Sequence, residues 1–97
     1  TPKCDIYETA ESLSVCLEIP GVDEDDVQIA FDGENGILAV AGRRKKPTCA
    51  QRKRVHLMEM PSGPFEKMLR VNVDIAEGGV EASLRDGVLH VLMRKAC

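Results

Sequence analysis

Among the side chains that are able to act as nucleophiles, bases or metal ligands, cysteines and histidines are few. They are Cys4, Cys16, Cys49, Cys97, His56 and His90. No cysteines form a Cys-x-x-Cys pair and no histidine stands at zinc-finger spacing, so we expect no metal site. His56 and Cys49 would form a nucleophile and base couple, but they lie in or beside a long polar segment that would hold hydrogen-bond geometry poorly. We therefore expect no catalytic residue, no enzymatic activity and no cofactor.

The thiols are expected to be structural or incidental groups of a reduced, cytoplasmic chain. Charged residues make up 30% of the sequence, and its start shows no charged-then-apolar signal segment. Cys16 lies within a strand-like pattern, and His90 is expected at a surface or edge position of another strand. No apolar run reaches the roughly 20 residues that a membrane helix needs, so no membrane partner is expected.

Two charged runs carry opposite signs. Residues 23–26 read DEDD, but their spacing does not match a calcium-binding EF-hand loop, so a solvated turn is expected. Residues 43–54 read RRKKPTCAQRKR and hold seven of the 13 Lys and Arg residues. Nucleic-acid modules add stacking aromatics or a phosphate-cradling glycine loop, which this run lacks. With a net charge of -3 for the chain, the run is predicted to be an exposed loop, and no nucleic-acid partner is expected.

Alternating apolar and polar residues predict several short strands. Turn residues separate them, including Pro20-Gly21, Asp32 to Gly36 with its Asp-Gly and Asn-Gly pairs, and Ala76 to Gly79. The expected strands cover residues 5–9, 12–19, 27–31, 37–42, 65–73, 80–85 and 88–93, with a further short strand at 55–60. Nothing in the chain predicts a long helix.

The segment 80–93 predicts the hairpin on which the fold depends. Asp86-Gly87 favours a two-residue turn, because Gly adopts positive φ freely and Asp tolerates it. That turn pairs Arg85 with Val88 and places six apolar residues on one face, namely Val80, Ala82, Leu84, Leu89, Val91 and Met93. A hairpin with one apolar face needs a second layer. We therefore predict an all-β, immunoglobulin-like β-sandwich of about eight short strands, formed by residues 1–97 as a single domain.

Four stretches resemble, in their order and spacing, the α-crystallin domain of small heat-shock proteins. They are the opening strand and turn at residues 5–11 (DIYETAE), the V-x-acid-L-P-G segment at 15–22 (VCLEIPGV), the L-x-I-x-G-x-R strand at 37–44 (ILAVAGRR) and the A-x-x-x-x-G-V-L signature at 82–89 (ASLRDGVL). The resemblance covers about residues 5–95.

The sequence departs from that family in three respects. Lys67 stands where the family's F-x-R-x-F-x-L-P strand has a characteristic arginine, and a lysine cannot form the same bidentate fork. The family's amino-terminal arm and its carboxy-terminal Ile-x-Ile/Val tail are both missing. Because those tails build large oligomers in the family, a higher oligomer is expected only of a full-length form.

The resemblance implies the core of an ATP-independent holdase chaperone, which binds unfolding client proteins and prevents their aggregation. In the family, an apolar groove between two edge strands accepts the Ile-x-Ile/Val tail of another subunit. The corresponding groove residues here would be Val27, Ile29, Phe31, Val80, Ala82 and Leu84.

The resemblance also implies a homodimer formed by strand exchange. The segment between Gly42 and Gly63 is similar in length to the loop of plant and bacterial members, in which the loop donates a strand to the partner's first strand. The interface would then contain Ile6, Tyr7, Glu8, Arg54, Val55, His56, Leu57, Lys67 and Arg70.

Two other functions remain open from the sequence. The first is a CS-type cochaperone domain, a related sandwich that binds another chaperone and is monomeric, because it lacks the strand-donating loop. The second is a nucleic-acid-binding module that uses the basic run at residues 43–54.

Overall fold

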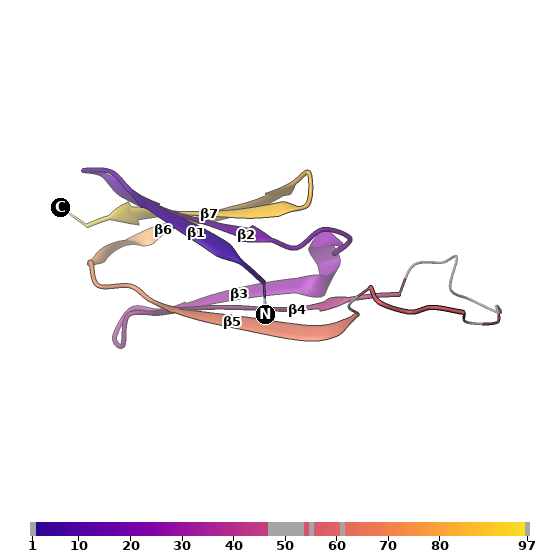
Figure 1. Cartoon of the computed structure of the whole chain (residues 1–97). Helices are drawn as coiled ribbons and strands as arrows, with labels where there is room; N and C mark the ends of the chain where they lie inside the picture. The colour runs from indigo at the N-terminus through magenta and orange to yellow at the C-terminus, as the bar shows by residue number, and fades with distance from the viewer. Residues whose placement is uncertain (1, 47–53, 55, 61, 97) are drawn as a thin grey trace.

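A computed structural model describes residues 2–46, 54, 56–60 and 62–96 of the chain. These residues form a sandwich of two antiparallel sheets (Figure 1). One sheet has the strand order β1-β2-β7-β6 and the other has the order β3-β4-β5. The strands are β1 (Cys4–Glu8), β2 (Ser12–Glu18), β3 (Val27–Asp32), β4 (Ile37–Arg44), β5 (Gly63–Arg70), β6 (Ile75–Arg85) and β7 (Val88–Lys95). The predicted all-β sandwich is confirmed.

The core lies between the sheets and is almost entirely aliphatic. The alternating patterns of β2, β4 and β7 place every second side chain in the interior, as the period of two requires. No polar or charged residue of the described chain is buried. The buried hydrophobic residues of the core are Leu13, Val15, Leu17, Ile19, Val22, Leu38, Val40, Val71, Leu89, Val91 and Met93.

The hairpin at the end of β6 forms as predicted. Asp86 and Gly87 both have positive φ, 53° and 78°, as a type I′ turn requires. Arg85 pairs with Val88, and Val80 pairs with Met93. The turn also contacts the residue that follows β2, because the Ile19 amide donates to the Gly87 carbonyl at 2.8 Å.

The structure corrects the predicted limits of two strands. Residues 76–79, expected as a turn, lie inside β6, where the register against β7 shifts between Ile75 and Val80. Gly78, with φ of 71°, lies in this irregular stretch, which is a bulge within the strand. β5 ends at Arg70 rather than at residue 73; beyond it, the Val71 amide donates to the carbonyl of Gly36, in the turn before β4, at 2.7 Å.

The strand expected at residues 55–60 is not present in the described part of that segment. Residues 56–60 have no strand pairing, and Val55 lies outside the described residues. Figure 1 shows this segment projecting beyond the ends of β4 and β5, away from the sandwich. A strand needs a neighbour for its backbone groups, and the described residues of this single chain offer none at that place. The acidic run at residues 23–26 includes a 3-10 turn at Glu24–Asp26 that is not buried.

Candidate functional site

The sandwich has two open sides, because neither sheet closes on itself. The edge strands are β1 and β6 in one sheet, and β3 and β5 in the other. Pro2 and Lys3, which lead into β1, and the start of β5 line one cavity, so these two edges flank the same side of the sandwich. The edges β6 and β3 therefore bound the opposite side. An edge strand carries unpaired backbone donors and acceptors that are able to pair with another extended segment.

The β3/β6 side contains all six predicted groove residues. The three groove residues of β3 share the core-facing side of their sheet, because they pair with core-facing positions of β4: Val27 with Gly42, Ile29 with Val40 and Phe31 with Leu38. The three groove residues of β6 face the core in the same way, through their partners on β7: Val80 with Met93, Ala82 with Val91 and Leu84 with Leu89. Five of the six are half-buried and Ala82 is exposed. Because they lie on edge strands, they form an apolar rim to the core. Their role in binding stays a prediction.

The β1/β5 side contains the first group of predicted dimer residues. Ile6 and Glu8 lie opposite Val15 and Leu13 of β2, so both occupy the core-facing side of β1. Ile6 is nevertheless 48% exposed, because no strand pairs with β1 on its outer edge in the single chain. Tyr7, on the other face of β1, is 59% exposed.

Lys67 and Arg70 lie on opposite faces of β5. Lys67 pairs with Val40, so its half-buried side chain lies in the core-facing row, between Phe65 and Leu69. Arg70 is exposed on the outer face. Among the described residues, no carboxylate lies within ion-pair distance of the Lys67 ammonium group. The lysine therefore brings an unpaired charge to the open β1/β5 side.

The loop residues predicted for the interface lie apart from β1 within the single chain. Arg54, His56 and Leu57 are exposed and have no regular structure, and Val55 is outside the described residues. The segment continues with exposed apolar side chains: Leu57 is 77% exposed, Met58 54% and Met60 71%. The structure thus does not bring these residues to Ile6, Tyr7 and Glu8 of the same copy (Figure 1).

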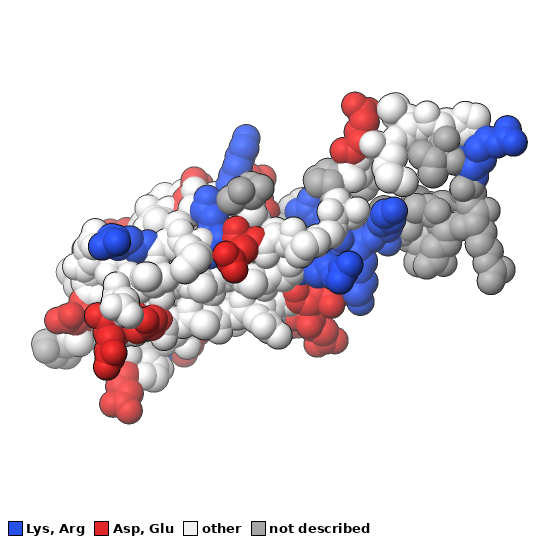
Figure 2. Space-filling model, turned by 90° about the horizontal axis from the view of Figure 1, so that it is seen from below, with Lys and Arg blue, Asp and Glu red and all other residues white. Residues whose placement is uncertain are grey.

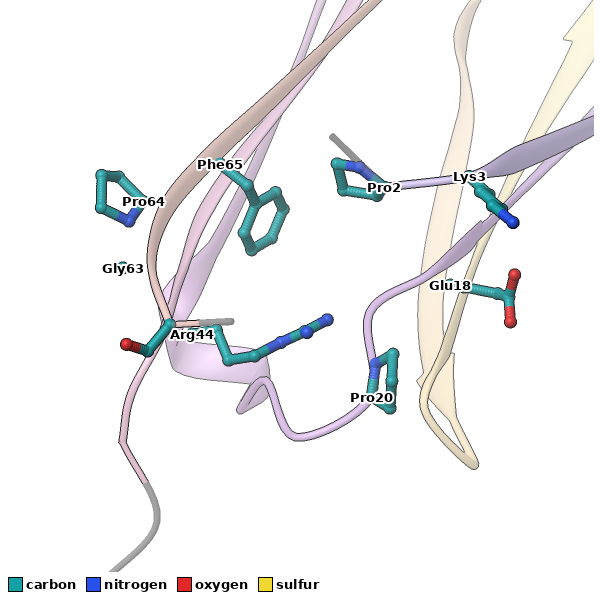
Figure 3. Close-up of a pocket in the computed structure, with 9 residues that line it drawn as sticks. Pro2, Lys3, Glu18, Pro20, Arg44, Gly63, Pro64 and Phe65 are labelled. Atoms are coloured by element: carbon teal, nitrogen blue, oxygen red, sulfur yellow. The ribbon is translucent and has the colours of Figure 1, made fainter. Parts of the chain in front are cut away.

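A cavity of about 420 Å³ lies at the end of the β1/β5 side (Figure 3). Pro2, Pro20 and Phe65 give it apolar walls, and the Arg44 side chain reaches into it below the Phe65 ring. The Arg44 Nε atom is buried and has no hydrogen-bond partner among the described residues. A buried donor without an acceptor is costly, so this arginine is suited to an anionic or carbonyl group from outside the chain. Sequence reasoning missed Arg44, because its family motif gave no sign that it faces a cavity.

The two charged runs meet at the base of the projecting loop. Lys45 Nζ lies 3.2 Å from Asp26 Oδ2, which partly neutralises both runs. Figure 2 shows Lys and Arg gathered where the sandwich meets the loop, while much of the visible face is uncharged. Among the described residues, no group of three or more His, Cys, Asp or Glu side chains is placed to hold a metal ion. No helix in the described part of the chain is long and apolar enough to cross a bilayer.

The structure also reveals a pair of side chains that the sequence did not suggest. Cys16 on β2 lies directly opposite His90 on β7, and its Sγ is 3.5 Å from His90 Nδ1. The two residues are 74 positions apart, so only the strand register brings them together. Beside them, the negative charge of Asp5 and then the hydrogen bond that Tyr7 Oη donates to Asp5 Oδ2, at 3.3 Å, raise the pKa of Tyr7.

Comparison with known proteins identifies the family. The sequence profile of the Hsp20/alpha crystallin family matches residues 5–96. The chain therefore belongs to the Hsp20/alpha crystallin family. This confirms the resemblance and extends it by one residue at the carboxyl end.

Individual relatives and structures agree with that assignment. Small heat shock protein C2 of Rickettsia felis is 29% identical over 97% of this chain and 60% of its own length. The 22.0 kDa heat shock protein of Arabidopsis thaliana is 33% identical over 96% of this chain and 47% of its own length. The structure of heat shock protein 16.0 from Schizosaccharomyces pombe matches with a TM-score of 0.88 and 26% identity, covering 99% of this chain and 87% of that one. The chain thus spans about half to three-fifths of the curated relatives it matches.

Proposed function

We propose that this chain is the core of an ATP-independent holdase chaperone that binds unfolding proteins and prevents their aggregation. It acts as one domain formed by residues 1–97, in a cytoplasmic and reducing setting, and it catalyses no reaction. The observation that carries the proposal is the apolar rim of the β3/β6 side, where two edge strands present half-buried side chains beside unpaired backbone groups.

The physical basis is the addition of a strand to an open sheet edge. An unfolding protein exposes extended apolar segments, and β3 or β6 offers such a segment a row of backbone hydrogen bonds. The alternating side chains of the segment enter the rim between Ile29 and Phe31 on one strand and Val80 and Leu84 on the other. Each contact is weak, which suits a partner that must later be released.

The opposite side supports a homodimer formed by strand exchange. β1 is an edge strand with Ile6 and Tyr7 exposed, and the segment that begins at Leu57 exposes apolar side chains far from its own sandwich. Pairing each segment with the partner's β1 would cover both surfaces. It would also bring polar atoms of a second copy towards the buried Arg44 Nε and the unpaired Lys67. Larger oligomers would belong to a full-length form.

A single substitution in the rim tests client binding. Ala82 is exposed and faces the groove, so Ala82→Trp should fill the groove without unfolding the sandwich. We expect the variant to lose most of its ability to prevent aggregation of a thermally unfolding substrate protein, measured by light scattering, and to lose binding of an extended Ile-x-Ile peptide.

Ser83→Trp is the matched control. Ser83 is the next residue on β6 and is also exposed, but it lies on the outer face. It should suppress aggregation as well as the parent protein does. Equal activity of the Ala82→Trp and Ser83→Trp variants would show that clients bind elsewhere.

A further inference from the structure

The outer face of the four-stranded sheet carries a row of four polar side chains. Asp5 on β1 lies opposite Cys16 on β2, Cys16 lies opposite His90 on β7, and His90 lies opposite Ser83 on β6. Within this row the Cys16 thiol and the His90 imidazole are in contact, with Sγ 3.5 Å from Nδ1. When the imidazole carries its proton on Nε2, Nδ1 is free to accept the thiol proton.

The Cys16 thiol is also accessible. Cys16 is half-buried and His90 is exposed. A hollow of about 160 Å³ lies at this end of β1 and β2, and the residues that line it include Cys16, Lys3 and Glu18. A thiol that has a base within hydrogen-bond distance and an open approach is in the kind of environment that makes a cysteine reactive.

We propose that Cys16 and His90 form a thiol modification site that exchanges with low-molecular-weight disulfides. Nδ1 of His90 takes the proton from Cys16 Sγ, and the thiolate attacks one sulfur of the disulfide. A new bond forms between Sγ and that sulfur while the bond within the disulfide breaks, and the departing thiolate takes the proton back from the imidazolium. The products are Cys16 in a mixed disulfide and one free small thiol. The reaction is reversed by excess thiol.

Cys4 provides a matched comparison within the same hollow. It lies on β1 one residue before Asp5, is half-buried like Cys16, and lines the same space. Its side chain lies on the core-facing side of the sheet, opposite Leu17, and has no histidine opposite it. The two thiols therefore differ in the presence of the imidazole and in the face of the sheet on which they lie, because Cys4 packs against the core.

The test compares two proteins that each keep one thiol. One carries Cys4→Ala, Cys49→Ser and Cys97→Ser and keeps Cys16; the other carries Cys16→Ala with the same changes at 49 and 97 and keeps Cys4. We expect Cys16 to react about tenfold faster with dithiodipyridine at neutral pH, because Cys16 has an imidazole nitrogen within 3.5 Å to take its proton. His90→Asn in the first protein should reduce its rate to about that of Cys4. Mass spectrometry after treatment with glutathione disulfide should place the adduct on Cys16.

The pH dependence of the reaction rate shows whether His90 acts as a base or whether Cys16 is only more accessible than Cys4. The rate difference should vanish above about pH 9, where thiols ionise without help. The charged groups around the pair also have defined effects: Asp5→Asn should raise the rate by removing a negative charge next to the thiolate. The groups that face the site are Lys3, Asp5 and Tyr7 from β1 and its approach, Glu18 from β2, Arg94 from β7, and Glu81 and Arg85 from β6.

Two results would overturn the site. Rates for Cys16 and Cys4 within about twofold of each other at neutral pH would show that the imidazole has no effect. A tenfold advantage of Cys16 that persists at alkaline pH and in the His90→Asn variant would show that only exposure distinguishes the two thiols. If the His90→Asn protein does not fold, the comparison of the two parent proteins and the Asp5→Asn variant still decides between these outcomes.

Discussion

The two open sides of the sandwich differ in charge. On the β3/β6 side, the core-facing residues of both edge strands are uncharged and mostly half-buried. On the β1/β5 side, the corresponding rows include Glu8 and Lys67 among apolar neighbours, and Arg44 enters the cavity at one end. An uncharged rim accepts many apolar segments, whereas fixed charges demand a partner with matching groups. The difference favours variable clients on the first side and a second copy of the chain on the other.

The largest effect on stability is expected from a substitution of Gly42, which lies between the edge strands β3 and β5. Gly42 of β4 lies opposite Val27 of β3 and Phe65 of β5. A Cβ atom at this position would lie 2.6 Å from the Asp26 carbonyl oxygen and 2.6 Å from Phe65 Cζ. Gly42→Ala should therefore lower the free energy of unfolding by about 2–3 kcal/mol, because backbone as well as the ring must move. Urea unfolding followed by circular dichroism measures this loss.

Ala41→Ser is the control for that substitution, because Ala41 is the preceding residue of β4 and lies on the other face. It should leave the unfolding midpoint nearly unchanged. A Gly42→Ala protein as stable as the Ala41→Ser protein would mean that β4 does not hold its two neighbours as closely as the structure shows.

Removal of residues 47–55 should abolish dimer formation on the β1/β5 side and leave peptide binding on the β3/β6 side. The shortened chain lacks the reach to place its loop on a partner, so we expect its mass in solution, measured by light scattering under reducing conditions, to fall from that of a dimer to that of a monomer. Binding of an Ile-x-Ile peptide to the β3/β6 side should remain. A dimer of unchanged stability would refute strand exchange, and a parent protein that is already monomeric would favour the CS-type cochaperone reading.

The sequence predicted the layers of this fold because alternation and turn chemistry are local signals. The alternation of Leu13, Val15 and Leu17 with polar residues predicts β2. The pair Asp86-Gly87 fixes the register of β6 against β7. The bulge at Gly78 and the early end of β5 depend on contacts with distant backbone, which a local pattern does not contain. The edge positions of Ile29 and Val80 came from the family resemblance. The sequence could not predict the Cys16–His90 pair or the cavity position of Arg44, because both depend on how separate strands pair and pack.

The smallest effect on stability is expected from the turn that leads from β3 to β4. Asn35 Nδ2 donates to Asp32 Oδ2 at 2.7 Å, and the Asn35 and Glu34 amides donate to Oδ1 at 3.3 and 3.0 Å. These bonds, the Asn35 side-chain bond first, lower the pKa of Asp32 below its ordinary value of 3.8. A lowered folded-state pKa gives stability that is present above the unfolded-state value and is lost as the pH falls through the folded-state pKa.

Thermal midpoints measured between about pH 6 and pH 2 test this turn. Asp32→Ala should have a slightly lower midpoint than the parent protein at pH 6, and the two curves should converge in acid. Because none of the predicted dimer residues lies in this turn, dimer mass should not change. Curves that stay parallel down to pH 2 would contradict the role of the ionised carboxylate.

Amide hydrogen exchange, resolved by residue, tests the division of the two sides most directly. Adding an extended Ile-x-Ile peptide should slow exchange in β3 and β6 and leave β1 unchanged. Raising the protein concentration through the dimer range should slow exchange in β1 and leave β3 and β6 unchanged. Protection of the same edge strands in both experiments would contradict the account.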